Sequence, residues 1–427
     1  MTTGEEKFVL TGDIRKRWKL ADIVYKVYCN DCNESNMFLR AFYNSVNEKM
    51  SLAWQFSPSR DGKIIHIGWS TIGEMWIEYK ERGKLNTVYI DTPNDRIHRL
   101  VADALDYAQN HFKEFNKYNV RVLFKNKRLR AMVKNSIRIE SYGKEGIDYT
   151  SLTFQMNALG EFDARHIMYQ KANTLCHLLC AYTNQLFSIT EVELVTCDDD
   201  FYIENVWEEP SEDWIDDDEL YRTIEGTEDE EIILSKEFFD LFRISLEHMG
   251  DNRKLQLILN SAQTLYCARL LTKKERTDAS LAIPGITDLI NTEAVSALEP
   301  LACIDEFKIE KCECCGNNVY SISKRIKKLC KKYLPEHLVK MICDEKYSER
   351  SKFLHEGFVY TYEVGIGKSM PIISPMDGRS MSFVAPFVNR NLQDYVGYVF
   401  RKKVKEVLQG FIDNKHDNTI ELTSVNP

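Results

Sequence analysis

The chain has 427 residues, of which 44% are hydrophobic and 28% charged, a composition typical of folded proteins rather than disordered or fibrous ones. This length predicts two or three domains, each large enough to bury its own core. No apolar run approaches the 18 or so residues of a membrane span, and the first residues do not resemble a signal peptide. With twelve cysteines, the chain is expected to hold reduced thiols in the cytoplasm rather than a disulfide framework.

The N-terminal region, residues 1–197, is predicted to be an α+β domain. Runs rich in β-branched and aromatic residues predict strands at 63–69, 75–79, 87–90, 120–124 and 136–140. Apolar residues at helical spacing predict helices at 96–115 and 164–187. We expect this region to sense a signal and regulate the rest of the chain.

Residues 198–231 form an acidic segment that is predicted to link two domains. The segment contains 17 Asp or Glu residues and one basic residue, Arg222, so the remainder of the chain carries a formal charge of +7. A solvated linker is one interpretation of this composition. The other is an intramolecular mimic of nucleic acid that covers a basic groove and inhibits the protein. A basic body is compatible with a nucleic-acid partner in either case.

From residue 232 to residue 427 the pattern predicts an all-α domain. Apolar residues recur every three to four positions at 234–249, 253–271, 286–304, 319–333, 338–341, 345–356 and 389–412. Five or more helices with short connections indicate a helical bundle, an architecture that hosts many functions.

One predicted helix of this bundle, between Asp344 and Gly357, gathers groups that suit phosphate chemistry. Asp344 is expected to cap its N-terminus and Gly357 to end it. Arg350 offers a permanent positive fork for phosphate oxygens, and His355 can move protons near neutral pH. Their separation of five residues should not align them on one helix face, so they would line two edges of a groove or meet across a two-fold axis.

The sequence pattern Tyr347-x-x-Arg-Ser-Lys-x-x-His-x-Gly357 resembles that of the ApeA-like branch of the HEPN superfamily, which is found in anti-phage abortive-infection proteins. The resemblance covers about the last 190 residues. It implies a HEPN-like bundle and a metal-independent endoribonuclease that acts as a homodimer or higher homo-oligomer. It also implies a phage-derived trigger and an RNA substrate, with transfer RNA as one candidate. Arg350, Ser351 and His355 take the catalytic roles, and Tyr347 and Lys352 contact substrate.

One feature favours an alternative, a non-catalytic module that binds RNA, a nucleotide or a protein. This chain has Glu356 where the branch usually has glycine after the histidine, and a carboxylate there repels phosphate. Arg350 could instead be a salt-bridge partner of Glu299 or Glu345. The bare Arg-x4-His pattern is weak, because it recurs at Arg243–His248 in a stretch expected to pack in the core.

A basic run and a cysteine knuckle precede the motif in sequence. The run is Lys324, Arg325, Lys327, Lys328, Lys331 and Lys332, in which Lys324 and Lys328 are candidate RNA contacts. Cys312 and Cys315 have the spacing of half a structural zinc site, with Cys303, Cys330 and Cys343 as further thiols nearby. The alternative is a loop with accessible thiols. No cofactor is expected for catalysis.

Overall fold

The computed structural model describes residues 18–80, 83–125, 129–196, 231–247, 252–277, 286–305, 310–311, 318–319, 322–357, 372–373, 381–382 and 390–420. The chain divides into two compact units. The first comprises Met1–Tyr118 and Met156–Met168, and the second Asn119–Gln155 and Tyr169–Pro427. Of the predicted acidic linker, only Glu231 lies within the described residues.

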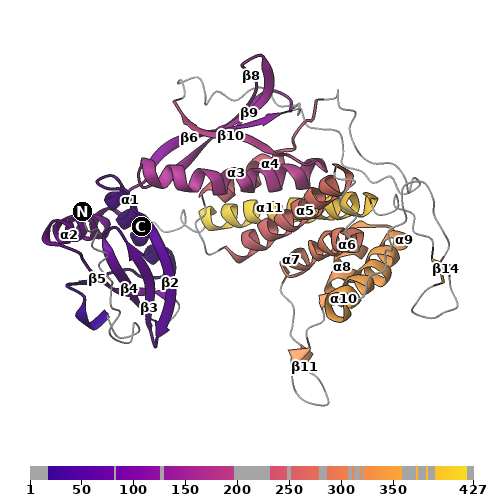
Figure 1. Cartoon of the computed structure of the whole chain (residues 1–427). Helices are drawn as coiled ribbons and strands as arrows, with labels where there is room; N and C mark the ends of the chain where they lie inside the picture. Colours follow the sequence, from indigo (N-terminus) through magenta and orange to yellow (C-terminus); the bar gives the residue numbers. More distant parts are fainter. Residues whose placement is uncertain are drawn as a thin grey trace, which may run out of the picture. The chain divides into compact units, whose positions relative to one another are not determined.

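The first unit is built on a five-stranded antiparallel sheet in the order β1-β5-β4-β3-β2 (Figure 1). Its strands are β1 (Ile23–Lys26), β2 (Trp54–Asp61), β3 (Ile64–Ser70), β4 (Gly73–Tyr79) and β5 (Leu85–Asp91). Helices α1 (Cys32–Asn47) and α2 (Asp95–His111) pack on this sheet through a core that includes Phe38, Phe42, Val88, Ile90, Val101 and Leu105. Burial of these apolar side chains is the main force that holds the unit together.

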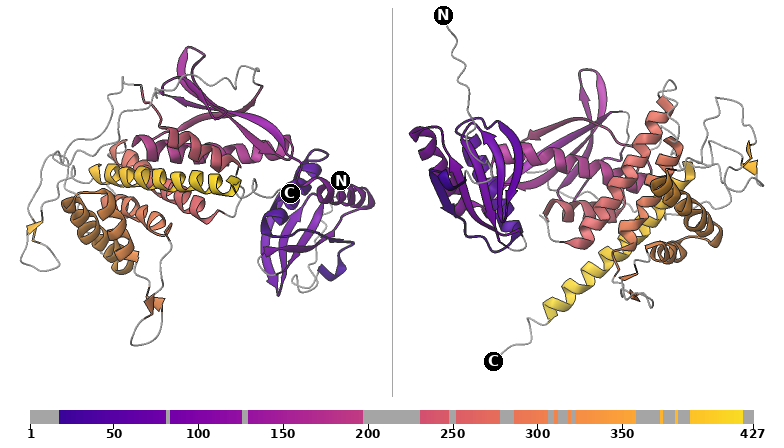
Figure 2. Two further views of the ribbon diagram at one scale, coloured as in Figure 1. Left: turned by 180° about the vertical axis from the view of Figure 1, so that it is seen from behind. Right: turned by 60° about the horizontal axis from the view of Figure 1, so that its bottom comes forward.

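A second antiparallel sheet follows, in the order β10-β6-β9-β8-β7. Its strands are β6 (Asn116–Lys125), β7 (Met132–Lys134), β8 (Ile137–Lys144), β9 (Ile147–Ala158) and β10 (Ile189–Val195). Helices α3 (Glu161–Thr183) and α4 (Lys236–Glu247) lie along one face of it (Figures 1 and 2). The Phe154 ring of β9 meets the Phe242 ring of α4 edge to face, with centroids 5.1 Å apart.

This packing explains why the division into units does not coincide with the boundary expected at residue 197. The Tyr182 ring of α3 also contacts Phe238 of α4 and Phe400 of the last helix. Most of the second sheet therefore belongs to the same unit as the C-terminal helices. The expected order, an α+β region followed by a helical one, is confirmed.

The remaining helices are α5 (Arg253–Thr277), α6 (Ile286–Ser296), α7 (Leu298–Ala302), α8 (Ile322–Tyr333), α9 (Glu336–Val339), the π-helical segment η4 (Lys340–Lys346), α10 (Tyr347–Glu356) and α11 (Arg390–Ile420). Two short ribbons interrupt them, β11 (Glu310–Lys311) with β12 (Asn318–Val319) and β13 (Ile372–Ile373) with β14 (Met381–Ser382). The ribbon before residue 320 was not predicted, since two-residue strands carry no periodicity. No helix in the described part of the chain is long and apolar enough to cross a membrane.

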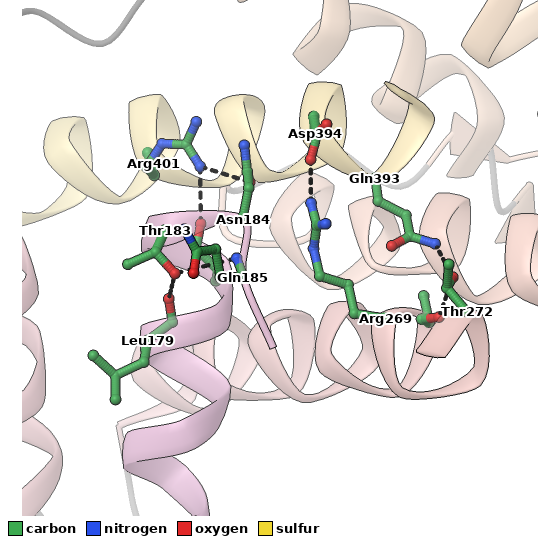
Figure 3. Close-up of polar contacts among 11 residues, drawn as sticks. Leu179, Thr183, Asn184, Gln185, Arg269, Thr272, Gln393, Asp394 and Arg401 are labelled. Atoms are coloured by element: carbon green, nitrogen blue, oxygen red, sulfur yellow. Dashed lines mark hydrogen bonds and ion pairs between the residues drawn. The ribbon is translucent and has the colours of Figure 1, made fainter. Parts of the chain in front are cut away.

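Polar contacts tie α11 to two helices of the same unit (Figure 3). The guanidinium Nη1 of Arg401 donates to the Ala181 carbonyl and to Asn184 Oδ1, each at 3.0 Å. Asn184 follows α3 in the left-handed conformation, with φ +56°, which asparagine tolerates better than most residues. Arg269 of α5 forms an ion pair with Asp394 of α11, both largely buried. These contacts fix α11 beside α3 and α5, since a buried charge must be paired.

Candidate active site

The candidate motif lies on α10, at the end of a continuous helical run that starts at Glu336. Asp344 was predicted to cap this helix, and that prediction is wrong, because η4 carries the helical backbone through it without a break. The Asp344 carboxylate instead accepts hydrogen bonds from Lys327 Nζ of α8, at 2.7 and 3.0 Å. The predicted end is confirmed: Gly357 has φ +66°, and its N–H donates to the Phe353 carbonyl. A π-helical turn is rare and often adjoins a functional site.

Arg350 is held against α6 and α7 by two polar contacts and lies over a ring of its own helix. Its Nη2 lies 2.8 Å from Glu299 Oε1, and its Nε donates to Ser296 Oγ at 3.2 Å. Its guanidinium carbon lies 5.4 Å from the centre of the Tyr347 ring. The arginine side chain is only 17% exposed, so its charge is partly removed from water. The ion pair to Glu299, one of the two alternatives considered from the sequence, is present.

Glu299 also accepts a hydrogen bond from the Tyr347 hydroxyl, at 3.0 Å and on the same oxygen that meets Arg350. Burial, followed by the nearby carboxylate, raises the pKa of Tyr347 to about 12, so this hydroxyl keeps its proton at neutral pH. Tyr347 therefore orients the Glu299 carboxylate, and through it the guanidinium. Tyr347 was predicted to contact substrate, which stays a prediction; in the structure its hydroxyl contacts Glu299.

Glu293 is a second acid beside Arg350. It precedes Ser296 and Glu299 at intervals of three residues, which places the three side chains along one side of α6 and α7. Burial raises the pKa of Glu293, and the positive charge of Arg350 opposes the shift in part. The sequence analysis did not identify Glu293 or Ser296, because their role depends on the packing of α10 against α6.

His355 lies in the last turn of α10 and is exposed. Within the described residues it makes no hydrogen bond or ion pair. Five residues along a helix separate two side chains by about 140° around its axis, so Arg350 and His355 lie on different faces. Within one chain the structure therefore does not bring the two together. Ser351 and Lys352 are half-buried between them.

Helix α8 presents the basic run. Lys324 and Lys328 are both exposed, and their spacing of four residues places them on one face. Three other lysines of this helix meet acids: Lys327 with Asp344, Lys331 with Glu336, and Lys332 with Glu406. Such exposed pairs contribute little to stability, but they lower the net positive charge of the helix.

The predicted zinc ligands Cys312 and Cys315 lie outside the described residues. Of the nearby thiols, Cys330 of α8 is buried and shares a hydrogen bond with the half-buried Cys343 of η4. The described residues contain no group of three or more His, Cys, Asp or Glu side chains placed to hold a metal ion. The zinc site thus stays a prediction.

No protein-family model, curated protein or solved structure matches the chain significantly. The functional assignment therefore depends on the residues of the chain and on their geometry.

Proposed function

We propose that this protein is a metal-independent endoribonuclease of the HEPN type, a cytoplasmic effector of anti-phage defence that acts as a homodimer. The observation that supports it most is the contrast along α10. Long-range contacts hold Arg350 in place, while His355, one and a half turns later, faces solvent. A fixed cation and an accessible imidazole are the groups that RNA cleavage without a metal requires.

In the proposed reaction, the 2′-hydroxyl of RNA attacks the adjacent phosphorus atom. His355 takes the hydroxyl proton, and His355 of the partner subunit donates a proton to the departing 5′-oxygen. Arg350 stabilises the additional negative charge of the phosphorane-like transition state, and Ser351 positions the phosphate. The products are a 2′,3′-cyclic phosphate and a 5′-hydroxyl. DNA is not cleaved, because it lacks the attacking hydroxyl.

The position of the basic helix agrees with this proposal. The exposed lysines Lys324 and Lys328 lie on α8, which packs against η4 directly before α10. RNA phosphates held by α8 would therefore be close to the motif.

A second candidate is a module that binds RNA or a nucleotide without cleaving it. The ion pair of Arg350 with Glu299 argues against catalysis in this state, because it partly neutralises the cation that cleavage would need. The exposed lysines of α8 would then hold RNA without cleaving it. Glu356, next to His355, adds a further negative charge at the end of the helix.

The test incubates total RNA in EDTA with the wild type and with His355→Ala and Arg350→Ala variants, and maps the new ends. Loss of the general base should lower the cleavage rate about 10²- to 10⁴-fold, and loss of the cation about 10²- to 10³-fold. Arg243→Ala is the matched control, since Arg243 begins the second Arg-x4-His pattern, and it should cleave as the wild type does.

The same four proteins are then expressed in cells challenged with phage, which supplies the proposed trigger. Cleavage and growth arrest by the wild type and Arg243→Ala alone would support the nuclease. RNA binding without new ends in either setting would favour the binding module. Equal cleavage by the wild type and His355→Ala would refute a role for this site.

A further inference from the structure

The guanidinium of Arg350 has two edges, each of which can donate two hydrogen bonds to an oxyanion, and one of these edges is occupied. Ser296 Oγ accepts from Nε and Glu299 Oε1 meets Nη2, so these two residues together cover the Nε/Nη2 edge. The Nη1 nitrogen makes no hydrogen bond or ion pair within the described residues. A phosphate that needs the Nε/Nη2 edge has to replace the Glu299 carboxylate.

The surroundings of Arg350 hold this carboxylate in place. Tyr347 donates its hydroxyl to Glu299 Oε1 at 3.0 Å, and the Glu299 side chain is only 28% exposed. Partial burial strengthens the attraction between the two charges relative to an ion pair in water. Glu293, within electrostatic reach of the same guanidinium, adds negative charge whenever it is ionised. These carboxylates reduce the attraction of Arg350 for a polyanion in this state.

We propose that Glu299 is a built-in competitor of the RNA backbone: its carboxylate occupies the place of a phosphodiester oxygen at the Nε/Nη2 edge of Arg350 and must be displaced before RNA binds to that edge. This inference rests on the proposed function only for the identity of Arg350 as the phosphate-binding group. According to this inference, the Glu299 side chain of α7 keeps the affinity of the site for RNA low in the resting state. The bond exchanged is an ion pair, so no covalent change is involved.

The experiment measures binding separately from cleavage. The probe is a fluorescent single-stranded RNA oligonucleotide with 2′-O-methyl groups, which lacks the attacking hydroxyl and cannot be cleaved by the proposed route. Fluorescence anisotropy gives its dissociation constant for the full-length wild type, for Glu299→Gln and for the double variant Glu299→Gln with Arg350→Ala. Removal of one partly screened charge beside the phosphate should tighten binding about tenfold in Glu299→Gln. The double variant should lose this gain.

The pair formed by Arg243 and Glu247 provides the matched control. It is also an arginine–glutamate ion pair, at 3.0 Å, and its arginine also begins an Arg-x4-His pattern. Glu247→Gln removes the same formal charge from the same unit and should leave RNA affinity unchanged. Should Glu299→Gln fail to fold, Tyr347→Phe serves instead, because it removes only the hydrogen bond that anchors the carboxylate. A smaller gain in the same direction is expected from it.

Three results would overturn the inference: no tightening in Glu299→Gln, equal tightening in Glu247→Gln, or a gain that persists without Arg350. A Glu299→Gln variant that binds as the wild type does but cleaves more slowly would assign Glu299 to positioning Arg350 instead. Cleavage of ordinary RNA is scored in parallel. If Glu299→Gln binds RNA more tightly through Arg350 but neither it nor the wild type cleaves RNA, the inference stands and the nuclease proposal falls. If the wild type cleaves RNA but Glu299→Gln binds no more tightly, the nuclease proposal stands and the inference falls.

Discussion

Gly397 of α11 is a position at which the structure predicts a large effect of adding a single methyl group. A Cβ atom there would lie 2.3 Å from Asn184 Oδ1 and 3.2 Å from Arg401 Nη1. The asparagine cannot easily move away, because it is in the left-handed conformation and its Oδ1 accepts from Arg401 at 3.0 Å. Gly397→Ala therefore has to break this contact or shift α11 away from the end of α3.

The expected magnitude follows from three contributions. Overpacking costs about 1–3 kcal/mol, and loss of a hydrogen bond to a charged group costs about 1.5–3 kcal/mol. Alanine regains about 1 kcal/mol over glycine in a helix interior. The net expectation is a destabilisation of about 2–4 kcal/mol, with the packing and hydrogen-bond contributions outweighing helix propensity.

Urea unfolding followed by far-ultraviolet circular dichroism measures this change as a lower midpoint with an unchanged slope. Since the chain forms two units, the transition that contains the helices is analysed by itself. Gly143→Ala is the control, because no atom lies within 4 Å of a Cβ atom at this exposed strand position. Asn184→Gly combined with Gly397→Ala should restore part of the loss. A Gly397→Ala variant as stable as the wild type would refute the contact between α11 and α3.

Three further predictions concern the helices around the candidate site. Cys343 should react with iodoacetamide before Cys330. The hydrogen bond that the two thiols share lowers the pKa of Cys343, whereas the same bond together with burial raises the pKa of Cys330. Peptide mass spectrometry at pH 7–8 gives the order of labelling, and faster labelling of Cys330 would contradict the prediction. Burial opposes ionisation of Glu406, but hydrogen bonds, the one from Lys332 first, outweigh burial and lower the pKa of Glu406 to about 2. The ionised carboxylate therefore stabilises the fold above the ordinary carboxyl pKa of about 4.5, and this stabilisation is lost as the pH falls toward 2. Glu406→Gln should flatten the acid side of the plot of unfolding free energy against pH. Lys324→Ala should weaken RNA binding uniformly across sequences and reduce the salt slope by about one unit, and an unchanged slope would remove Lys324 from the interface.

The helical region was predicted well because its elements have strong periodicity and clear ends. The glycine at the end of α10 and the extents of α4 and α8 agree with expectation to within about three residues, whereas α5 starts where expected but continues to Thr277. The first unit was predicted in part: β3, β4 and β5 were recognised, but β1, α1 and β2 were not. The polar content of α1, with two asparagines and a glutamate in its first turns, hides its apolar face, which becomes visible only when Phe38 and Phe42 meet the sheet.

The candidate site shows where prediction from sequence stops. Spacing along one helix showed that Arg350 and His355 would not share a face. It could not show that Ser296 and Glu293 lie beside the arginine, because those contacts depend on how α10 packs against α6. The cap assigned to Asp344 failed for the same reason: a π-helical turn and a lysine from α8 override the local preference of an aspartate.

The two Arg-x4-His patterns of this chain differ in how their arginines are held. Arg243 pairs with Glu247 one turn along its own helix, and both side chains are largely exposed, at 39% and 53%. Such a pair contributes only about 0.3–0.5 kcal/mol and forms in an isolated helix. Arg350 meets a glutamate 51 positions away and a serine on a different helix, and it is 17% exposed. Its geometry therefore exists only in the folded bundle, which makes Arg350, and not Arg243, the arginine whose position can be coupled to a ligand or to a second subunit.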